Sequence, residues 1–414
     1  MPRDIPVGNG DVLVTFDKDY RVRDLYYPRV GRFNHTDGHV QRFGVWVDGT
    51  LSWVEEDGWT RELRYKPDSL VTEVRLVHKN MGIELTCQDA VDFHEAIYFK
   101  RVVVRDLLGK ERDVRVFFHI DLSIGGSPVG DTANYDPSTS SVVLYKDDFY
   151  FLYNACDRAK CGIDHWAIGS KRVGGAEGTW RDAEDGRLGR NAISQGSVDA
   201  TIGSNLVVPP NGESYVCMWC AMGRSYEDVK RLNRLIWERT PEALLARTEA
   251  YWKLWSRKEE FDTSPLPEHL RDAFYRSQLI LRTQVDNGGA IIAANDSDIT
   301  HFAGDHYSYC WPRDGALVDW ALIKSGQSEL SRSFLRFAAK CIGKDGYFLH
   351  KYTPEGRLAS SGHPWMLEGQ EILPIQQDET ALVVWVLERH FDAFKDVEFV
   401  KPLYEPLVVR PAEW

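Results

Sequence analysis

The sequence has no excess of positive charge and no long hydrophobic run. Its 414 residues carry a net charge of -12, and no block of Lys or Arg runs along the chain, so no nucleic-acid partner is expected. No apolar run approaches the roughly 18 residues that a membrane-spanning helix needs. The start, MPRDIPVGNGDVLV, lacks the basic and apolar segments of an export signal. We therefore expect a cytoplasmic protein with no membrane partner.

Cysteine is also scarce. The seven cysteines, an odd number scattered through a large chain, do not look like a disulfide framework. Four of them, Cys156, Cys161, Cys217 and Cys220, have spacings that zinc ligands tolerate. However, SYVCMWCAMG is typical of a buried strand, in which residues three apart point to opposite faces. The strand is the favoured interpretation, and no metal or organic cofactor is expected.

Apolar and aromatic residues are plentiful, at 43% and 12% of the chain. This supply is ample for packed cores, and 414 residues exceed what one core usually organises, so two domains are expected. The rings indicate either ring-lined clefts or a tryptophan-rich interior.

Residues 10 to 223 alternate with period two between short turns, as in FGVWVDG, LVTEVRLVH and DVRVFFHIDLSI. So many strands predict packed antiparallel sheets, which we expect to form an N-terminal β-sandwich over 1–223. Near residue 225 the period changes. Ser225 with Asp228, and Thr240 with Pro241, are typical of two helix starts, which predicts a helical linker over 224–264.

Every later periodic segment is helical. The pattern predicts helices at about 267–286, 313–325, 328–343, 377–394 and 397–410. The fourth, TALVVWVLERHF, is apolar almost all round, so we expect it to be buried on most sides.

One stretch, DHYSYCWPRDGA, crowds rings and opposite charges before a helix. Pro312 fits a first turn, which places Arg313 and Asp314 at the opening of the helix. Their donors and acceptors suit adjacent hydroxyls, and three rings nearby could supply flat faces for a sugar: Tyr307, Tyr309 and Trp311. The alternative is a helix-start ion pair beside buried aromatics.

A second cluster gathers carboxylates in a long loop and at the following helix start. Glu368, Glu371, Asp378 and Glu379 lie within twelve residues, with Trp365, Gln376 and Gln377 around them. The carboxylates are either partners of a helix dipole or part of a pocket lining.

Three motifs carry a resemblance to a known family. YSYCWPRDGALVDWALIKSG, GYFLHKYTPEGRLASS and EILPIQQDETALVVW resemble the prokaryotic branch of glycoside hydrolase family 15, which holds glucoamylases, glucodextranases and some trehalases. IPVGNGDVLVTFDKDYRVRDLYYP also resembles the start of that branch's N-terminal β-sandwich. The resemblance implies that the helices belong to an (α/α)6 barrel.

The resemblance also implies roles for individual residues. Arg313 and Asp314 match the pair that grips the terminal glucose, and Trp311 and Tyr307 match aromatics beside it. Asp378 with Gln376 matches a Pro-Gln-x-Asp type element, spaced here as PIQQD. The predicted substrate-binding residues are Tyr307, Trp311, Arg313, Asp314, Trp365, Gln376 and Asp378.

Family members invert configuration, with a general acid and a general base about 6.5–9.5 Å apart. The family's acid lies in a DLWEE-like motif, and its base lies later; neither matches a position in this chain. A twelve-helix barrel also needs about 300 residues, whereas about 150 follow Pro265. We expect residues 265–414 to form part of the barrel, with both catalytic glutamates downstream of Trp414, as a split gene or a truncated chain would leave it.

The predicted function is exo-acting hydrolysis, with inversion, of α-linked gluco-oligosaccharides or trehalose. The expected ligands are α-glucans, malto- or isomalto-oligosaccharides or trehalose, with a second polypeptide as a possible complement of the barrel. One alternative is a phosphorylase, which would need a phosphate site. The other is a non-catalytic carbohydrate-binding protein or an inactive fragment.

Overall fold

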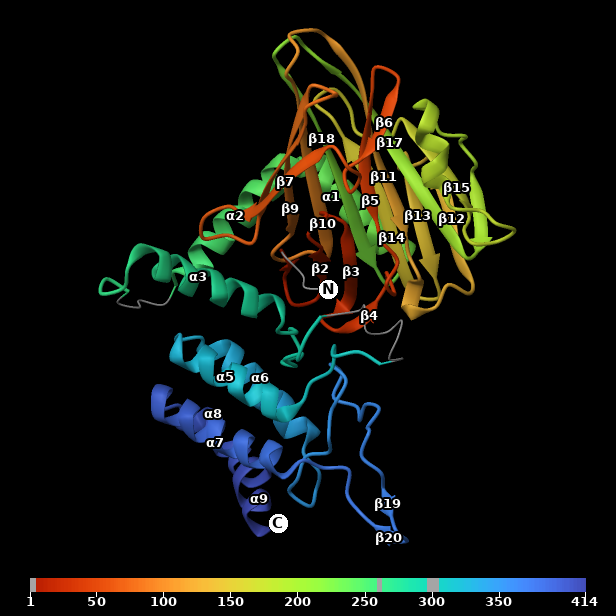
Figure 1. The fold of residues 1–414 in the computed structure, drawn as a ribbon. Coiled ribbons are helices and arrows are strands. Elements are labelled where there is room, and N and C mark those ends of the chain that lie inside the picture. The colour runs from red at the N-terminus through yellow and green to blue at the C-terminus, as the bar shows by residue number, and fades with distance from the viewer. Residues whose placement is uncertain (1–4, 259–262, 296–304) are drawn as a thin grey trace. The chain divides into compact units, whose positions relative to one another are not determined.

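The computed structural model describes residues 5–258, 263–295 and 305–414. The chain divides into two compact units, Met1–Tyr27 with Phe33–Leu254, and Pro28–Arg32 with Trp255–Trp414. The first unit holds the large sheets and two helices, and the second is mainly helical (Figure 1). The predicted three-part division stays a prediction, and residues 259–262 of the expected linker lie outside the described residues.

A nine-stranded antiparallel sheet lies in the first unit. Its spatial order is β16-β12-β13-β14-β18-β10-β9-β8-β7. The central pair, β10 and β18, aligns Ile97 with Ala221 at one end and Arg105 with Glu213 at the other. The strands are Trp59–Tyr65 (β7), Thr72–His78 (β8), Ile83–Val91 (β9), Ile97–Asp106 (β10), Asp131–Asp136 (β12), Ser141–Lys146 (β13), Phe149–Cys156 (β14), Ile193–Gly196 (β16) and Glu213–Gly223 (β18).

Two further sheets have five and four strands. The five-stranded sheet has the order β15-β17-β11-β5-β6, and the four-stranded sheet follows chain order. Their strands are Val7–Gly8 (β1), Leu13–Phe16 (β2), Val22–Arg29 (β3), Arg32–Asn34 (β4), Arg42–Val47 (β5), Thr50–Trp53 (β6), Arg112–Asp121 (β11), His165–Ser170 (β15) and Val198–Val208 (β17). Short 3-10 turns cover Ile124–Gly126 and Thr179–Asp185.

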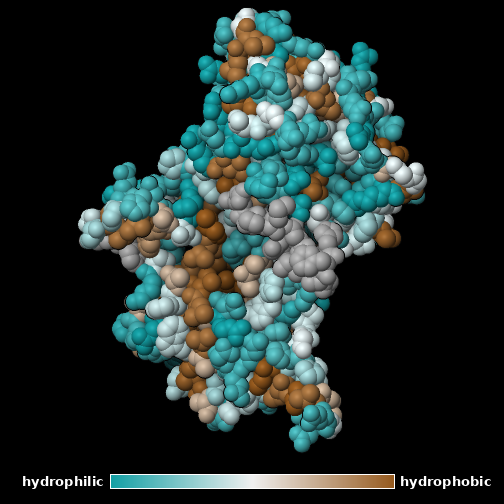
Figure 2. Space-filling model, in the orientation of Figure 1, coloured by the Kyte–Doolittle hydropathy of each residue, from teal (hydrophilic) through white to brown (hydrophobic). Residues whose placement is uncertain are grey.

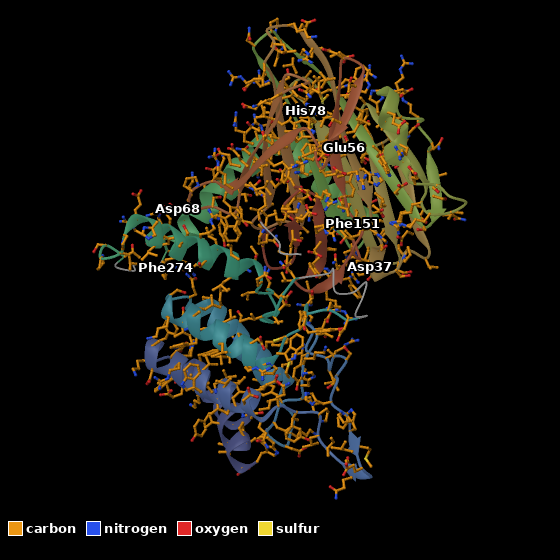
Figure 3. All side chains as sticks on the ribbon, viewed as in Figure 1. Asp37, Glu56, Asp68, His78, Phe151 and Phe274 are labelled. Carbon is orange, nitrogen blue, oxygen red and sulfur yellow. A yellow bond between two sulfur atoms is a disulfide. The ribbon has the colours of Figure 1, made fainter. Side chains whose placement is uncertain are left out.

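Side-chain alternation builds the core of this unit. Along β9, buried Ile83, Leu85 and Cys87 alternate with half-buried neighbours, because successive side chains of a strand point to opposite faces. One hydrophobic cluster joins buried residues of all three sheets. Phe151 of β14, labelled in Figure 3, belongs to this cluster. Its ring centroid lies 4.6 Å from that of His35. The large antiparallel sheets predicted from period two are confirmed.

Helices α1 (Tyr226–Arg239) and α2 (Pro241–Ser256) follow the last long strand. The Ser225 hydroxyl accepts the Asp228 N–H, and the Thr240 hydroxyl accepts the Ala243 N–H, so both predicted helix starts are confirmed. Three apolar residues of α1 share a buried cluster with Trp219 of β18, which lays this helix against the nine-stranded sheet (Figure 1): Val229, Leu232 and Ile236.

The cysteines were not expected to form a disulfide framework, and this expectation needs one correction. A disulfide joins Cys156 and Cys161, two of the four candidate zinc ligands. Cys217 and Cys220 do lie on opposite faces of β18. The Cys217 thiol is 3.7 Å from Glu242, whereas Cys220 belongs to the core shared by the sheets. The strand interpretation therefore accounts for this pair, and the described residues contain no group of ligands suited to a metal.

The helices of the second unit lie close to their predicted ranges. They are Glu268–Thr283 (α3), Pro312–Lys324 (α5), Ser328–Cys341 (α6), Gln377–Phe394 (α7), Val397–Tyr404 (α8) and Arg410–Glu413 (α9). The predicted helix at 397–410 is interrupted by a π-turn at Glu405–Val409. Pro402 and Pro406 lack the N–H that the regular hydrogen-bond ladder needs. A two-stranded hairpin, Met366–Leu367 (β19) and Gln370–Glu371 (β20), precedes α7.

The expectation that α7 is buried on most sides is wrong. One side is buried and includes Val383, Val386 and Leu387, but Ala381 is exposed, and Val384 and Trp385 are half-buried. Trp385 packs edge-on against Trp320 of α5, at 5.3 Å between ring centroids. Hydrophobic side chains reach the surface over these helices (Figure 2). An apolar sequence does not by itself determine how many neighbours a helix has.

Helices α5, α6 and α7 pack closely against one another. Gly315 allows α5 to approach α6, since a Cβ at this position would lie 2.4 Å from the Phe334 ring. A polar link joins the three helices nearby. The Ser331 hydroxyl of α6 lies 3.0 Å from Asp319 Oδ2 of α5 and 2.8 Å from His390 Nδ1 of α7. All three residues are fully buried.

Burial sets the protonation of this link. Desolvation raises the pKa of Asp319 to about 8 and lowers the pKa of His390 to about 4. The Ser331 O–H donates to Asp319 Oδ2, so the Nδ1–H of a neutral His390 is the group that donates to the Ser331 oxygen. Because the serine is central and buried, the link joins helices and offers no nucleophile to a substrate.

Replacing Ser331 by alanine is expected to lower the free energy of unfolding by about 1–3 kcal/mol, because Asp319 and His390 would both lose their buried partner. Urea unfolding at pH 7 measures the change. Ser333→Ala is the matched control, since that hydroxyl donates to the Glu329 carbonyl of its own helix. Equal effects of the two substitutions would contradict a linking role.

No helix among the described residues is both long and apolar enough to cross a bilayer.

Candidate functional site

Two loops that are distant in sequence lie side by side in the second unit. Cys310 and Tyr352 form an antiparallel bridge, in which each N–H donates to the other's carbonyl at 2.8 Å. On its other side, the Lys351 carbonyl accepts the Ala359 N–H at 3.0 Å. The chain turns between these contacts at Gly356, whose φ of +81° suits glycine. The bridge brings residues 350–351 beside the start of α5.

The start of α5 presents a tryptophan and two charges. Trp311 is the extended residue before the helix, Pro312 occupies the first turn, and Arg313 and Asp314 follow. Arg313 Nη1 donates to Asp378 Oδ2 at 2.8 Å, whereas its Nε lies 3.9 Å from Asp314. The principal partner of Arg313 is therefore on α7, not its neighbour in the sequence, so the helix-start ion pair is not the main contact.

Three rings gather before this helix. The Tyr307 and Trp311 centroids lie 5.8 Å apart with the planes tilted by 35°, and Tyr309 meets Trp311 nearly edge-on at 6.2 Å. Tyr309 also stacks on His306 at 4.2 Å. Because Tyr307 is 50% exposed, its ring surface is open to a ligand.

A buried lysine lies beneath the rings. The Lys351 ammonium is 4.5 Å from the Tyr309 centroid and 5.0 Å from the Trp311 centroid, and it pairs with Asp305 at 3.1 Å. Burial raises the pKa of Asp305, but the His306 N–H and Lys351 outweigh it and leave this pKa below its usual range. Asp305 is thus an anion near neutral pH and cannot donate a proton.

The start of α7 contributes a second set of polar groups. Asp378 is half-exposed beside Arg313, and the Gln376 amide lies 3.3 Å from His363 Nε2. Glu379 differs because it is fully buried, and neither of its carboxylate oxygens has a hydrogen-bond partner. Desolvation is the main cause that raises the pKa of Glu379 to about 8, with Arg313 opposing and Asp378 adding to the rise.

The start of α5 and the two loops beside it line a cavity of about 500 Å³. Its walls combine rings, a guanidinium, an ammonium and two carboxylates, which is suitable chemistry for a ligand with an apolar face and many hydroxyls. The lining residues are Ala293, Asp305, His306, Tyr307, Trp311, Arg313, Asp314, His350, Lys351 and Gly362.

The predicted binding residues fall into three groups. Tyr307, Trp311, Arg313 and Asp314 line the cavity. Asp378 and Gln376 are connected to this region through Arg313 and His363 rather than by lining it. Trp365 is 49% exposed next to the β19–β20 hairpin and does not line the cavity. The roles of all seven residues remain predictions.

Sequence reasoning missed several cavity residues. Asp305 and His306 open the same motif that supplied the predicted residues, and His350 and Lys351 stand in GYFLHKYTPEG. The only available signal was their position inside motifs already singled out. The contacts of His350 and Lys351 with Trp311 depend on the bridge between Cys310 and Tyr352, which no local pattern indicates.

No protein-family model matches the chain. An uncharacterized glycosyl hydrolase of Methanocaldococcus jannaschii is 23% identical over 402 residues, which cover 95% of this chain and 60% of that protein. The chain thus spans 60% of the length of this curated relative, and it is glycosyl hydrolase-like in sequence.

The solved structures that resemble the chain include two of carbohydrate-active enzymes. A bacterial glucoamylase complexed with acarbose has a TM-score of 0.73 and 15% identity, covering 100% of this chain and 60% of that one. A putative kojibiose phosphorylase from the human microbiome has a TM-score of 0.61 and 9% identity, covering 95% and 54%. At these identities the likeness shows the fold alone, a mixed β and α fold of large antiparallel sheets with helices.

Proposed function

We propose that the cavity holds the terminal glucose of an α-linked gluco-oligosaccharide or of trehalose, and that the whole protein releases this glucose by hydrolysis with inversion. The observation that carries the proposal is the grouping of Trp311, Tyr307, Arg313 and Asp314 around one cavity. The glycosyl hydrolase-like sequence supports the reaction class.

The chemistry of the cavity suits a neutral sugar. The rings of Trp311 and Tyr307 supply flat faces for the C–H face of a pyranose. Arg313 offers donors and Asp314 offers acceptors, and vicinal hydroxyls need both. A net charge of -12 is compatible with an uncharged substrate.

The proposed architecture is that of family 15. Residues 1–223 would form a β-sandwich, 224–264 a helical linker, and 265–414 part of an (α/α)6 barrel, completed by further chain or by a second polypeptide. The coverage of 60% of the glycosyl hydrolase relative and of the glucoamylase supports this proposal.

Inversion requires an acid that protonates the leaving oxygen and a base that activates water. We assign both to the part of the longer relatives that these residues do not span. The residues of this chain bind and orient the glucose: Arg313 and Asp314 fix its hydroxyls, and Trp311 excludes water from one face. Binding energy of this kind accelerates the reaction only when acid and base are present.

A phosphorylase is the second candidate, since a putative kojibiose phosphorylase shares the fold. The two activities differ in product. Hydrolysis gives free glucose whether or not phosphate is present, whereas phosphorolysis gives glucose phosphate and requires inorganic phosphate. Product analysis with maltose, isomaltose, trehalose and kojibiose, with and without phosphate, separates them.

Calorimetry tests the binding step. Residues 1–414 are expected to bind one of these disaccharides or acarbose. Binding without turnover by a protein that includes the remaining barrel would favour the non-catalytic alternative, and absence of binding would contradict the proposed site.

A further inference from the structure

His350 contacts the edge of Trp311 at the cavity wall. The Trp311 indole Nε1–H donates to His350 Nε2 at 3.2 Å, and the two rings stand nearly perpendicular, with centroids 6.1 Å apart. The other imidazole nitrogen, Nδ1, lies 3.0 Å from the Ser361 hydroxyl oxygen. The His350 backbone is fixed as well, since its N–H donates to the Pro374 carbonyl at 2.9 Å.

These contacts define one protonation state. An indole N–H is only a donor, so His350 Nε2 must accept and must carry no proton. The single proton of the neutral imidazole is then on Nδ1, where it donates to Ser361. A charged imidazolium would place an N–H against the indole N–H, and the hydrogen bond between the two rings would be lost.

The surroundings oppose a positive charge on this ring. Desolvation is the main cause that lowers the pKa of His350, and nearby His363, Lys351 and Arg313 lower it further, while Asp305 alone opposes them. The His363 ring lies 4.5 Å from that of His350. Protonation would thus add a cation beside Lys351, which already lies 5.0 Å from the Trp311 ring.

We infer that His350 is a positioning residue: its neutral imidazole holds Trp311 in place at the cavity wall, and protonation releases the ring. The consequence for sugar binding rests on the proposed function. If Trp311 is the platform for the glucose, affinity should stay constant near neutral pH. It should fall on acidification below the ordinary histidine value of about 6.5.

The first experiment needs no sugar. In ¹⁵N-tryptophan-labelled residues 1–414, the indole N–H signal of Trp311 is assigned by its loss in Trp311→Phe. This signal is expected to move with the titration of His350, followed by imidazole NMR, and to stay constant in His350→Gln. The glutamine oxygen can accept the indole N–H and does not titrate. An indole N–H chemical shift of Trp311 that stays constant while His350 titrates would overturn the inference.

The second experiment measures affinity between pH 5 and 8 with the sugar that binds. The affinity of the wild type is expected to be about tenfold lower at pH 5 than at neutral pH. This is the change expected from the loss of one hydrogen bond. His350→Gln should bind with a flat pH profile, and His350→Leu should bind weakly at every pH. His94→Gln, at an exposed site in the first unit, should keep the wild-type profile.

The two proposals can fail separately. A sugar that binds equally well to wild type, His350→Gln and His350→Leu at all pH values would refute the positioning role in binding and leave the proposed function intact. A Trp311 signal that follows His350, in a protein that binds none of the sugars, would support the positioning role and contradict the proposed function.

Discussion

Replacing Arg313 by alanine is expected to weaken binding of the glucoside by about 10- to 150-fold, the range for a lost hydrogen bond to a charged group. Arg313 lines the cavity, and its position is fixed by the 2.8 Å contact with Asp378. The fork of donors on arginine can bind two adjacent hydroxyls at once. Calorimetry with the best-binding sugar measures the loss.

The loss should not come from unfolding. The ion pair of Arg313 with Asp378 is partly exposed, with 32% and 53% of the two side chains accessible, and such pairs contribute little to stability. Arg313→Lys should recover only part of the affinity, because an ammonium lacks the planar fork. Arg389→Ala is the matched control, since Arg389 pairs with adjacent Glu388 on the surface of α7. Unchanged affinity in Arg313→Ala would exclude this arginine from the binding site.

Local patterns in the sequence predicted the helices well. The period of 3.6 residues and the position of Pro312 predicted α5 and α6 to within a few residues, because helix ends depend on neighbouring residues. The predicted caps at Ser225 and Thr240 form for the same reason. Such features need no knowledge of distant chain segments.

The contacts that shape the cavity could not be predicted in this way. The partner of Arg313 is Asp378 on another helix, and the acceptor for Trp311 is His350 across a bridge. Both depend on how distant segments pair, which residue type and spacing do not specify. The prediction that α7 is buried on most sides failed for the same reason. The apolar residues of a helix do not specify which other helices surround it.

Glu379→Gln is expected to stabilise the second unit, and the gain should grow as the pH rises from about 4.5 to 8. The folded state raises the pKa of this carboxyl from 4.5 to about 8, mainly by desolvation, with Asp378 and Asp314 adding to the rise and Arg313 opposing it. Between these values the folded protein binds more protons at Glu379 than the unfolded chain does. Stability therefore falls with rising pH through this window.

Glutamine has nearly the same shape as glutamate and no charge, so Glu379→Gln removes the pH dependence that this carboxyl gives to the free energy of unfolding. The variant should match the wild type below pH 4.5 and exceed it by an order of 2–4 kcal/mol near pH 8. Urea unfolding at pH 4.5, 6.5 and 8 measures the difference. Glu371→Gln is the control, because Glu371 is exposed on β20. A gain independent of pH would contradict a buried, proton-binding carboxyl.

The same substitution separates stability from binding. Because the pKa of Glu379 lies near 8, its carboxyl is mostly uncharged at pH 6.5, and the hydrogen bond that holds Arg313 is the one to Asp378. Glu379→Gln should therefore leave sugar affinity at pH 6.5 within about twofold of the wild type, whereas Arg313→Ala lowers affinity with little change in stability. A large loss of affinity in Glu379→Gln would instead mean that the charged carboxylate takes part in fixing Arg313, and that Asp378 alone is not sufficient to orient the guanidinium toward the cavity.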